Sequence, residues 1–409
     1  MGELLYLDTA RLGRMTAGAR QAHHAFTELA GEEGGSAYFE RFLRGGLDCL
    51  PSSFQGRYPG LAGWRGVGSL KESLRRLTGR RTDLPVLLAN RSAQLMKLAA
   101  RLLFHSCRNA LTTDLDWPGY QDILLAECRR VNRAVTVVPA RSGIAVEGIG
   151  EDELVERIRS EFTRNGCDGL FLTAVSSDGI RLPVERIVRS LEARCRVKFV
   201  GVDGAQDFCH AGADLRCCDL YLAGSHKWLG AYHPLGIGFY GRRRSIGRIE
   251  TTLVTMTACG DLDDPLLRFS GRLEAGSLAG LAETVSVAPL FSCQGAVDDC
   301  LDSLDAAGSV FTDRLKTLET TAELSQAEGW RPILPDQAFR SGILLLRPEE
   351  DHSDRLLPDA LRNAFRDRGI SLSTYEGGSI RLSIPATPWS GDERDHLQDA
   401  LRSVATGQC

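Results

Sequence analysis

The stretch that decides the fold runs from Val200 to Tyr240 and reads VGVDGAQDFCHAGADLRCCDLYLAGSHKWLGAYHPLGIGFY. It opens with an apolar run typical of a buried strand, and that run ends in an acid, Asp203. Further on, Lys227 lies between a histidine and a tryptophan, and the stretch closes with a second apolar run. Because burial lowers the pKa of a lysine and frees its neutral amine, Lys227 is a candidate nucleophile.

These two residues suit the chemistry of an aldehyde cofactor. A neutral lysine amine can form a Schiff base with an aldehyde. An aspartate at the end of a neighbouring strand can keep a pyridinium nitrogen protonated, which makes the ring an electron sink. The alternative is a surface lysine that follows a core strand, with Asp203 capping a turn.

The pattern Asp-x-Ala-Gln, followed at residues 225–227 by Ser-His-Lys, resembles the class V branch of fold-type I pyridoxal 5'-phosphate (PLP) enzymes. That branch includes cysteine desulfurases, cysteine C–S lyases, kynureninase-like enzymes and several aminotransferases. The spacing from Asp203 to Lys227 fits the branch, and the resemblance extends from Tyr6 to about Leu401. It implies PLP as the cofactor, an amino acid as the small-molecule substrate, and a homodimer with a shared active site.

The resemblance implies an α/β fold, the fold-type I PLP-transferase. Its large domain has a mainly parallel seven-stranded sheet, and its smaller domain is α+β. Alternating strand and helix patterns from about Leu84 agree with a parallel sheet. We expect an N-terminal segment over residues 1–60 that packs with the small domain and the site, a large PLP-binding domain over 61–289, and a small C-terminal α+β domain over 290–409.

By the resemblance, Lys227 is the catalytic lysine that carries the cofactor and later moves protons, and Asp203 pairs with the ring nitrogen. Gln206 contacts the phenolic oxygen or the imine. A predicted turn joins the strand at 86–89 to a helix, whose free N–H groups and positive dipole end favour a phosphate. The implied phosphate contacts are Ser92, Ala93, Ser225 and His226. Ala93 stands where many members have threonine, and an ordinary helix N-cap is the alternative for this turn.

Three further positions are implied as cofactor contacts. Trp117, in the segment DLDWPGYQ, stands where the family places an aromatic ring over the cofactor, with Tyr120 as second choice. An aromatic core residue beside a proline is the alternative. Ser176 stands where family members commonly have asparagine near the phenolic oxygen. Ser277 matches a threonine that reaches the phosphate of the partner subunit in dimeric members.

Arg381 lies in the sequence Ile-Arg-Leu-Ser, which resembles the family's late R-x-S strand, where the arginine binds the substrate α-carboxylate. A planar guanidinium can hold a carboxylate through two hydrogen bonds. A structural role beside an acid partner is the alternative for this arginine. The opening YLDTA at residues 6–10 resembles the family's YLDNAA, which lines the substrate side, so Thr9 and Ala10 are predicted to contact the substrate.

The loop before Arg381 narrows the reaction. Cysteine desulfurases carry a nucleophilic cysteine there, whereas residues 369–379 read GISLSTYEGGS. Persulfide chemistry needs a thiolate close to the substrate sulfur. The opening, the DLDWPGYQ segment and this cysteine-free loop resemble PLP enzymes of lincosamide antibiotic pathways in bacterial secondary metabolism, which process cysteine S-conjugates.

That closer resemblance implies C–S β-elimination on an S-substituted cysteine, which releases a thiol, pyruvate and ammonia. Two alternatives stay open. One is decarboxylation coupled to oxidative deamination of the same kind of conjugate, and the other is transamination. The choice depends on how the Cα bonds are oriented against the cofactor ring, which the sequence does not show.

Composition argues against several other classes. The net charge of −4 gives no electrostatic case for nucleic acid binding. No run of about eighteen apolar residues appears, and the first residues lack the pattern of a signal peptide, so we expect a cytoplasmic protein without a membrane span. The twelve cysteines have no regular spacing, which favours reduced core thiols, and we expect no metal site.

Three features in or just after the central stretch have a structural interpretation and not a functional one. Residues 236–241 fit G-x-G-x-x-G, but they read as a strand followed by arginines, not as the strand–turn–helix of a dinucleotide site. The basic run Arg242–Arg244 favours a solvated loop over a phosphate patch. His210 favours a core histidine over a site residue.

Overall fold

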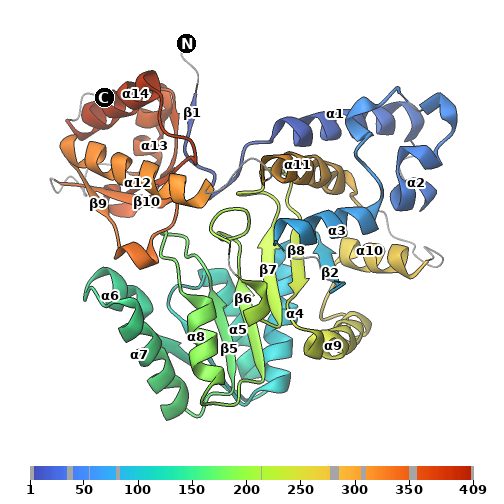
Figure 1. Ribbon diagram of the computed structural model, residues 1–409, viewed down its shortest axis with the longest axis horizontal. Helices are drawn as coiled ribbons and strands as arrows, with labels where there is room; N and C mark the ends of the chain where they lie inside the picture. The colour runs from blue at the N-terminus through green and yellow to red at the C-terminus, as the bar shows by residue number, and fades with distance from the viewer. Residues whose placement is uncertain are drawn as a thin grey trace.

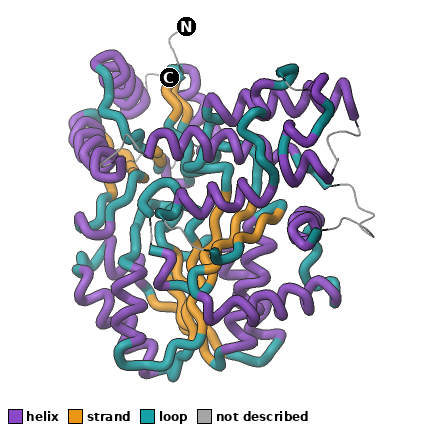
Figure 2. The backbone as a smooth tube through the Cα atoms, turned by 45° about the vertical axis from the view of Figure 1, so that its right-hand side comes forward, coloured by secondary structure: helices purple, strands orange, loops and turns teal. Residues whose placement is uncertain are grey.

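The computed structural model describes residues 4–34, 40–54, 56–79, 83–212, 214–276, 285–304, 310–349 and 357–406. Figure 1 shows a large part built around a central sheet, and a smaller part formed by the last helices and strands of the chain. In Figure 2 the strands gather in the middle of the large part with helices on both sides.

The central sheet has seven strands in the order β2-β8-β7-β6-β5-β3-β4. Strand β8 runs antiparallel to β2 and β7, and the remaining neighbours are parallel. The expected α/β fold with a mainly parallel seven-stranded sheet is therefore confirmed. The strands are β2 (Val86–Ala89), β3 (Asn109–Thr113), β4 (Ala134–Val138), β5 (Gly169–Thr173), β6 (Phe199–Asp203), β7 (Leu220–Gly224) and β8 (Gly236–Tyr240).

Apart from the edge strand β4, both faces of this sheet are buried, which explains the near-continuous apolar runs of its strands. Successive residues of a strand point to opposite faces, so Leu170 and Leu172 of β5 join one core while Phe171 joins the other. The surrounding helices are α3 (Val67–Leu77), α4 (Ser92–Ser106), α5 (Pro118–Arg130), α6 (Ala140–Ala145), α7 (Glu151–Arg164), α8 (Val184–Glu192), α9 (Ile246–Ala258) and α10 (Pro265–Ala275).

The smaller part is an antiparallel four-stranded sheet in the order β12-β13-β10-β9, with helices packed on it. A capping box at Ser390 and Glu393 starts its last helix. Its strands are β9 (Trp330–Ile333), β10 (Ile343–Pro348), β12 (Ser373–Thr374) and β13 (Ile380–Ser383). Its helices are α12 (Val310–Ala327), α13 (Pro358–Asp367) and α14 (Gly391–Ala405).

The N-terminal segment connects the two parts. Strand β1 (Leu5–Tyr6) pairs in parallel with β11 (Ile370–Ser371) of the smaller part. Helix α1 (Ala17–Glu33) then packs against α11 (Ala288–Leu304), and α2 (Glu40–Gly45) follows, as Figure 1 shows. Short 3-10 turns cover Leu47–Cys49, Ser52–Phe54, Pro59–Leu61, Leu215–Cys217, Arg243–Ser245, Gln337–Phe339 and Glu376–Gly378.

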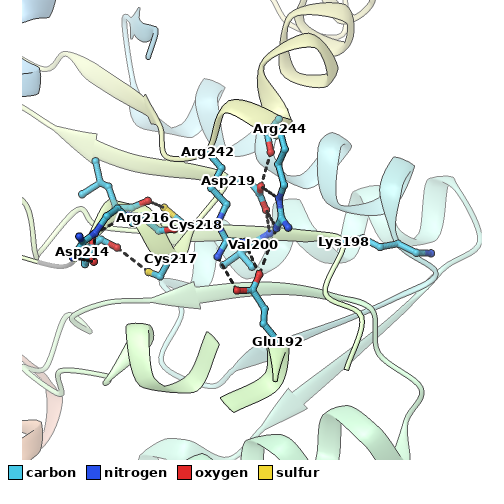
Figure 3. A network of polar contacts seen from close by, with 12 residues as sticks. Glu192, Lys198, Val200, Asp214, Arg216, Cys217, Cys218, Asp219, Arg242 and Arg244 are labelled. Atoms are coloured by element: carbon cyan, nitrogen blue, oxygen red, sulfur yellow. Dashed lines mark hydrogen bonds and ion pairs between the residues drawn. The ribbon is translucent and has the colours of Figure 1, made fainter. Parts of the chain in front are cut away.

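A buried acid, Asp219, holds the amino end of the central sheet together, directly before β7 (Figure 3). Its carboxylate accepts hydrogen bonds from Val200 N (2.8 Å), from the Ser245 hydroxyl and from Arg244 Nε (3.1 Å). Arg242 donates to Glu192 of α8 at 2.6 Å. The basic run lies at the surface as expected, since Arg243 and Arg244 are exposed, and each of its three guanidiniums pairs with an acid of the large part.

Two negative findings apply to the described ranges alone. No helix there is both long enough and apolar enough to cross a membrane. Nor does the described chain bring three or more His, Cys, Asp or Glu side chains together in an arrangement that could hold a metal ion.

Candidate active site

The catalytic candidates gather at the carboxyl ends of the parallel strands, where α/β folds place their ligands. Asp203 is the last residue of β6, and its register partner Thr173 is the last residue of β5. Lys227 follows the neighbouring strand β7 after Ser225 and His226. The sheet topology thus places the acid and the lysine on adjacent strand ends.

Burial controls the charges of this pair. Burial raises the pKa of Asp203 to about 6, although the hydrogen bond from Ala205 N (2.9 Å) and the charge of Lys227 both oppose the rise. Burial also lowers the pKa of Lys227, against the attraction of Asp203, and Arg381 lowers it further. The sequence predicted a lysine with a lowered pKa at this place. It also predicted a neighbouring carboxylate that a positively charged group would stabilise.

The N-terminal segment closes over the lysine. Gln206 Nε2 donates to Ala10 O at 2.7 Å, and Gln206 Oε1 accepts from Trp228 Nε1 at 2.8 Å. Ala10 N donates to the Ser383 hydroxyl of β13 at 2.8 Å. These bonds bring the segment that includes Thr9 and Ala10 next to both the lysine loop and the arginine strand. Gln206 thus joins the N-terminal segment to the lysine loop.

At the predicted phosphate turn, the described residues provide N–H donors at the helix start but no side-chain acceptor for them. Helix α4 begins at Ser92 after Arg91, and no side chain caps it, so the first N–H groups at Ser92 and Ala93 face outward from the helix end. His226 Nδ1 is buried and has no partner among the described residues. Burial, together with the charges of Lys227 and Arg91, lowers the pKa of His226 to about 4, which keeps the ring neutral.

Gly236 lets strand β8 approach the predicted phosphate turn closely. A Cβ on Gly236, at the start of β8, would lie 2.6 Å from both Arg91 C and Ser92 N. Only glycine therefore lets β8 pass this close to the start of α4. Ser225 is fully buried, and its hydroxyl donates to His233 O at 2.8 Å, which leaves its oxygen as an acceptor. The turn, the lysine loop and β8 meet at one point.

The two aromatic candidates differ in their surroundings. Trp117 is the N-cap residue of α5, and its side chain is 55% exposed. Tyr120 is buried, packs edge-on against Trp117 and hydrogen-bonds to Ser92. Burial and the nearby charge of Asp203 raise the pKa of Tyr120 above its usual range. Trp117 is therefore the more exposed of the two, while Tyr120 contacts the phosphate turn through Ser92.

Two other predicted contacts have a weaker position in the structure. The Ser176 hydroxyl is fully buried, donates to Asp178 and accepts from Ile180 N at 2.9 Å, so its own turn uses it. Ser277 lies outside the described residues. His210 is buried and stacks on Trp228 with ring centroids 3.7 Å apart, and both of its ring nitrogens have backbone partners. It is a core histidine, as expected.

Arg381 is buried and faces the same site. Its Nη1 donates to Ser177 O at 3.0 Å, its Nη2 donates to the Ser373 hydroxyl at 3.1 Å, and Asp8 Oδ1 lies 3.7 Å from Nη2. Arg381 Nε is buried and has no partner among the described residues. Asp8 is thus the acid partner that a purely structural role of Arg381 would require. The guanidinium nevertheless keeps a buried donor, Nε, for a substrate carboxylate.

Sequence reasoning missed Asp116 and the acid Asp8. Asp116 accepts hydrogen bonds from the hydroxyls of Thr112 and Thr173 (2.7 Å for Thr173), and burial raises its pKa to about 7. Asp8 also accepts from the Ser373 hydroxyl. The signal for Asp116 was its position, because it follows the carboxyl end of β3 by only three residues.

The donor set fits pyridoxal phosphate. The uncapped start of α4 and the unpartnered His226 Nδ1 suit a phosphate dianion. Lys227 could supply the amine for the aldehyde, and Asp203 the carboxylate for a ring nitrogen. Arg381 Nε supplies a buried donor for an amino acid carboxylate. The described residues therefore offer candidate partners for the phosphate, the aldehyde and the ring nitrogen of the cofactor, and for an amino acid carboxylate.

Comparisons with known proteins agree with this geometry. Residues 152–287 match the family model described as aminotransferase class V. No curated protein matches the chain significantly by sequence. Among solved structures, a cysteine desulfurase from Thermococcus onnurineus NA1 has a TM-score of 0.69 at 13% identity, covering 99% of this chain and 95% of that chain.

Two other solved structures illustrate the range of related folds. The ureidoglycine–glyoxylate aminotransferase of Bacillus subtilis has a TM-score of 0.62 at 13% identity, covering 83% of this chain and 84% of that chain. C-DES, in a structure with glycine covalently linked to its PLP cofactor, has a TM-score of 0.63 at 14% identity, covering 98% and 96%. The chain has the fold-type I PLP-transferase fold.

Proposed function

We propose that the protein is a PLP-dependent β-lyase that cleaves the C–S bond of an S-substituted cysteine. The cofactor is pyridoxal phosphate, in agreement with the class V match and the donor set. When bound, PLP withdraws electrons from the substrate Cα and stabilises negative charge there. The rest of the reaction depends on side chains of this chain.

Arg381 and Lys227 divide the work on the substrate. Arg381 Nε would bind the α-carboxylate and fix the orientation of the Cα bonds, which decides the bond that breaks. Lys227, whose pKa burial lowers, would take the proton from Cα and return a proton to a leaving group or a product. Asp203 would hold a proton at the ring nitrogen, and Gln206 with Trp228 would keep the lysine loop in place.

The observation that supports elimination best is the segment before Arg381. Residues 369–379 form the short strands β11 and β12 and a 3-10 turn, and Ser373 pairs in register with Arg381. This segment contains no cysteine. Among the described residues, the contacts of Lys227, Asp203 and Arg381 include no thiol either. A thiolate leaving group needs no second nucleophile, so elimination can proceed with these groups alone.

Overall, one water is consumed, and the S-substituted cysteine yields a thiol, pyruvate and ammonium. We propose a cysteine S-conjugate of bacterial secondary metabolism as the substrate, a cytoplasmic location, and a homodimer as the assembly. Two other reactions share the same groups. They are decarboxylation coupled to oxidative deamination of the conjugate, and transamination.

Product analysis tests the proposed reaction. The PLP-loaded protein is incubated with S-alkyl and S-glycosyl cysteines, and pyruvate, ammonia and free thiol are quantified, with Lys227→Ala as the inactive control. Equal amounts of the three products are expected from the wild type. If an aldehyde and CO2 are found instead, the reaction is the decarboxylation coupled to oxidative deamination and not elimination. Conversion of the cofactor to its amine form, reversed by a keto acid, would identify an aminotransferase.

A further inference from the structure

Away from the candidate active site, a polar cavity lies between α1, α11 and the 3-10 turn Pro59–Leu61. Its volume is about 170 Å³. Helix α1 contributes Gly18 to its wall, and α11 contributes Gln294, Asp298 and Asp299. None of the residues that line it belongs to the candidate active site.

Two neighbouring glycines leave the space that the two acids occupy. A Cβ on Gly18 would lie 2.8 Å from Asp299 Oδ1, and a Cβ on Gly63 would lie 2.7 Å from Asp298 Oδ2. Asp299 Oδ2 also accepts a hydrogen bond from Gly18 N at 2.7 Å. The carboxylates are thus fitted against backbone, and larger residues at these positions would push them out.

Gln294 adds a third oxygen. Its side chain is only 5% exposed and lines the cavity. Gln294 Nε2 donates to Asp298 Oδ1 at 2.7 Å, and because a carboxylate accepts hydrogen bonds, this bond fixes which end of the amide is the oxygen. Gln294 Oε1 has no partner among the described residues. A buried acceptor without a donor is rare and points to a ligand or an ordered water.

The charge of the cavity has one sign. No lysine or arginine is among the described residues that line the cavity. Two carboxylates and an amide oxygen therefore line a small, partly open cavity, and none of its described lining side chains is positively charged.

We propose that this cavity binds a hard cation through Asp298, Asp299 and the side-chain oxygen of Gln294. Calcium takes roughly six to eight oxygen ligands, including water, and prefers carboxylate and amide oxygens. Potassium shares the preference for oxygen ligands. The site is separate from the proposed lyase function, and it departs from our expectation that the chain binds no metal.

The cation would stabilise the cover of the active site. Asp299, one of the proposed ligands on α11, is hydrogen-bonded to Gly18 N of α1. The residues just before α1 hold the lysine loop: Gly13 N donates to His226 O at 2.7 Å, and Thr16 N donates to Gly230 O at 3.0 Å. Fixing α1 therefore fixes the segment that passes over Lys227. A ligand that binds only the folded state also raises the stability of the whole chain.

Terbium luminescence of the full PLP-loaded protein tests the site. Trp64 lines the cavity, so excitation of tryptophan should give saturable Tb³⁺ emission that Ca²⁺ displaces. Asp298→Asn removes one ligand charge and should weaken Tb³⁺ binding about tenfold or more. Asp302→Asn is the matched control, because Asp302 is exposed, lies one helical turn further along and does not line the cavity. It should change binding less than about twofold.

Thermal unfolding provides the second readout and separates the two ions. Saturating Ca²⁺ or K⁺ should raise the Tm of the wild type by about 3 °C, and the ion that does so is the one assigned. Gln294→Met, which keeps the volume but removes the oxygen, should reduce that rise to less than half. Equal Tb³⁺ binding by the wild type and Asp298→Asn, or no Tm rise with either ion, would overturn the proposal.

Discussion

The two ends of the central sheet each bury an aspartate, but only one of these acids is satisfied by the protein. Asp219, at the amino end, receives hydrogen bonds from Val200 N, Ser245 and Arg244. Asp203, at the carboxyl end, receives one from Ala205 N and otherwise relies on the charge of Lys227. A buried acid with many partners stabilises a fold, whereas a buried acid with few partners is suited to a ligand.

The largest effect should come from the unsatisfied acid. Asp203→Asn removes the negative charge that would hold a proton on the cofactor, so kcat should fall roughly a thousandfold. The free energy of unfolding should not fall, because the burial of the Asp203 charge outweighs the hydrogen bond from Ala205 N and the attraction of Lys227. Steady-state kinetics at equal PLP occupancy measures this kcat. A kcat within tenfold of the wild type would contradict the assignment of the unsatisfied acid to the chemistry.

The satisfied acid should show the reverse pattern. Asp219→Asn places an amide N–H against groups that donate to the carboxylate, so the free energy of unfolding should fall by about 3 kcal/mol. The variant that remains folded should keep its KM and kcat nearly unchanged. Urea unfolding and steady-state kinetics on the same sample give both numbers. A loss of kcat without a loss of stability would assign Asp219 to the chemistry.

The pH dependence of stability gives a second test of the buried Asp203. The folded-state pKa of Asp203 is raised from 3.8 to about 6, so its contribution to stability is full below about pH 3.8 and is lost as the pH rises through about 6. Without PLP, Asp203→Asn should therefore become more stable than the wild type by about 2 kcal/mol between pH 4 and pH 7.5. Urea midpoints at both pH values measure this. A constant difference would show that Asp203 is not destabilised by its burial.

Arg381 should give the smallest of these effects. Arg381→Lys keeps a charge near Asp8 but loses the planar donor set, so KM for the amino acid should rise about tenfold while kcat changes less. Ser177→Ala is a matched control, because Arg381 contacts only the backbone oxygen of Ser177. An unchanged KM would remove Arg381 from the substrate site and leave it as the ion-pair partner of Asp8.

The sequence predicted the carboxyl end of the sheet better than the amino end. Asp203 and Lys227 flank apolar strands, and a short local pattern places both at strand ends, where the structure has them. The pairing of Asp219 with Arg244 and Ser245 joins the start of one strand to a turn beyond the next. Many acids precede strands, so no local pattern marks the one that such partners will satisfy.

Two parts of the site could not be predicted from local patterns, because contacts between distant parts of the sequence form them. Asp8 and Arg381 are more than 370 positions apart in the sequence, and only the pairing of the N-terminal segment with the smaller sheet brings them together. Asp116 needs the neighbouring strand β5 to receive the Thr173 hydroxyl. Residue types and spacing identify which groups are chemically suited to a site, while the sheet order decides which of them meet.

An absorbance spectrum of the purified protein tests the central claim most directly. We predict that the wild type, after PLP is added and the excess removed, retains a near-visible cofactor band. Lys227→Ala should lose this band while its Tm and its far-ultraviolet circular dichroism stay close to those of the wild type. A wild type that retains no band, or a Lys227→Ala variant that retains the same band, would contradict the assignment of Lys227 as the residue that binds the cofactor.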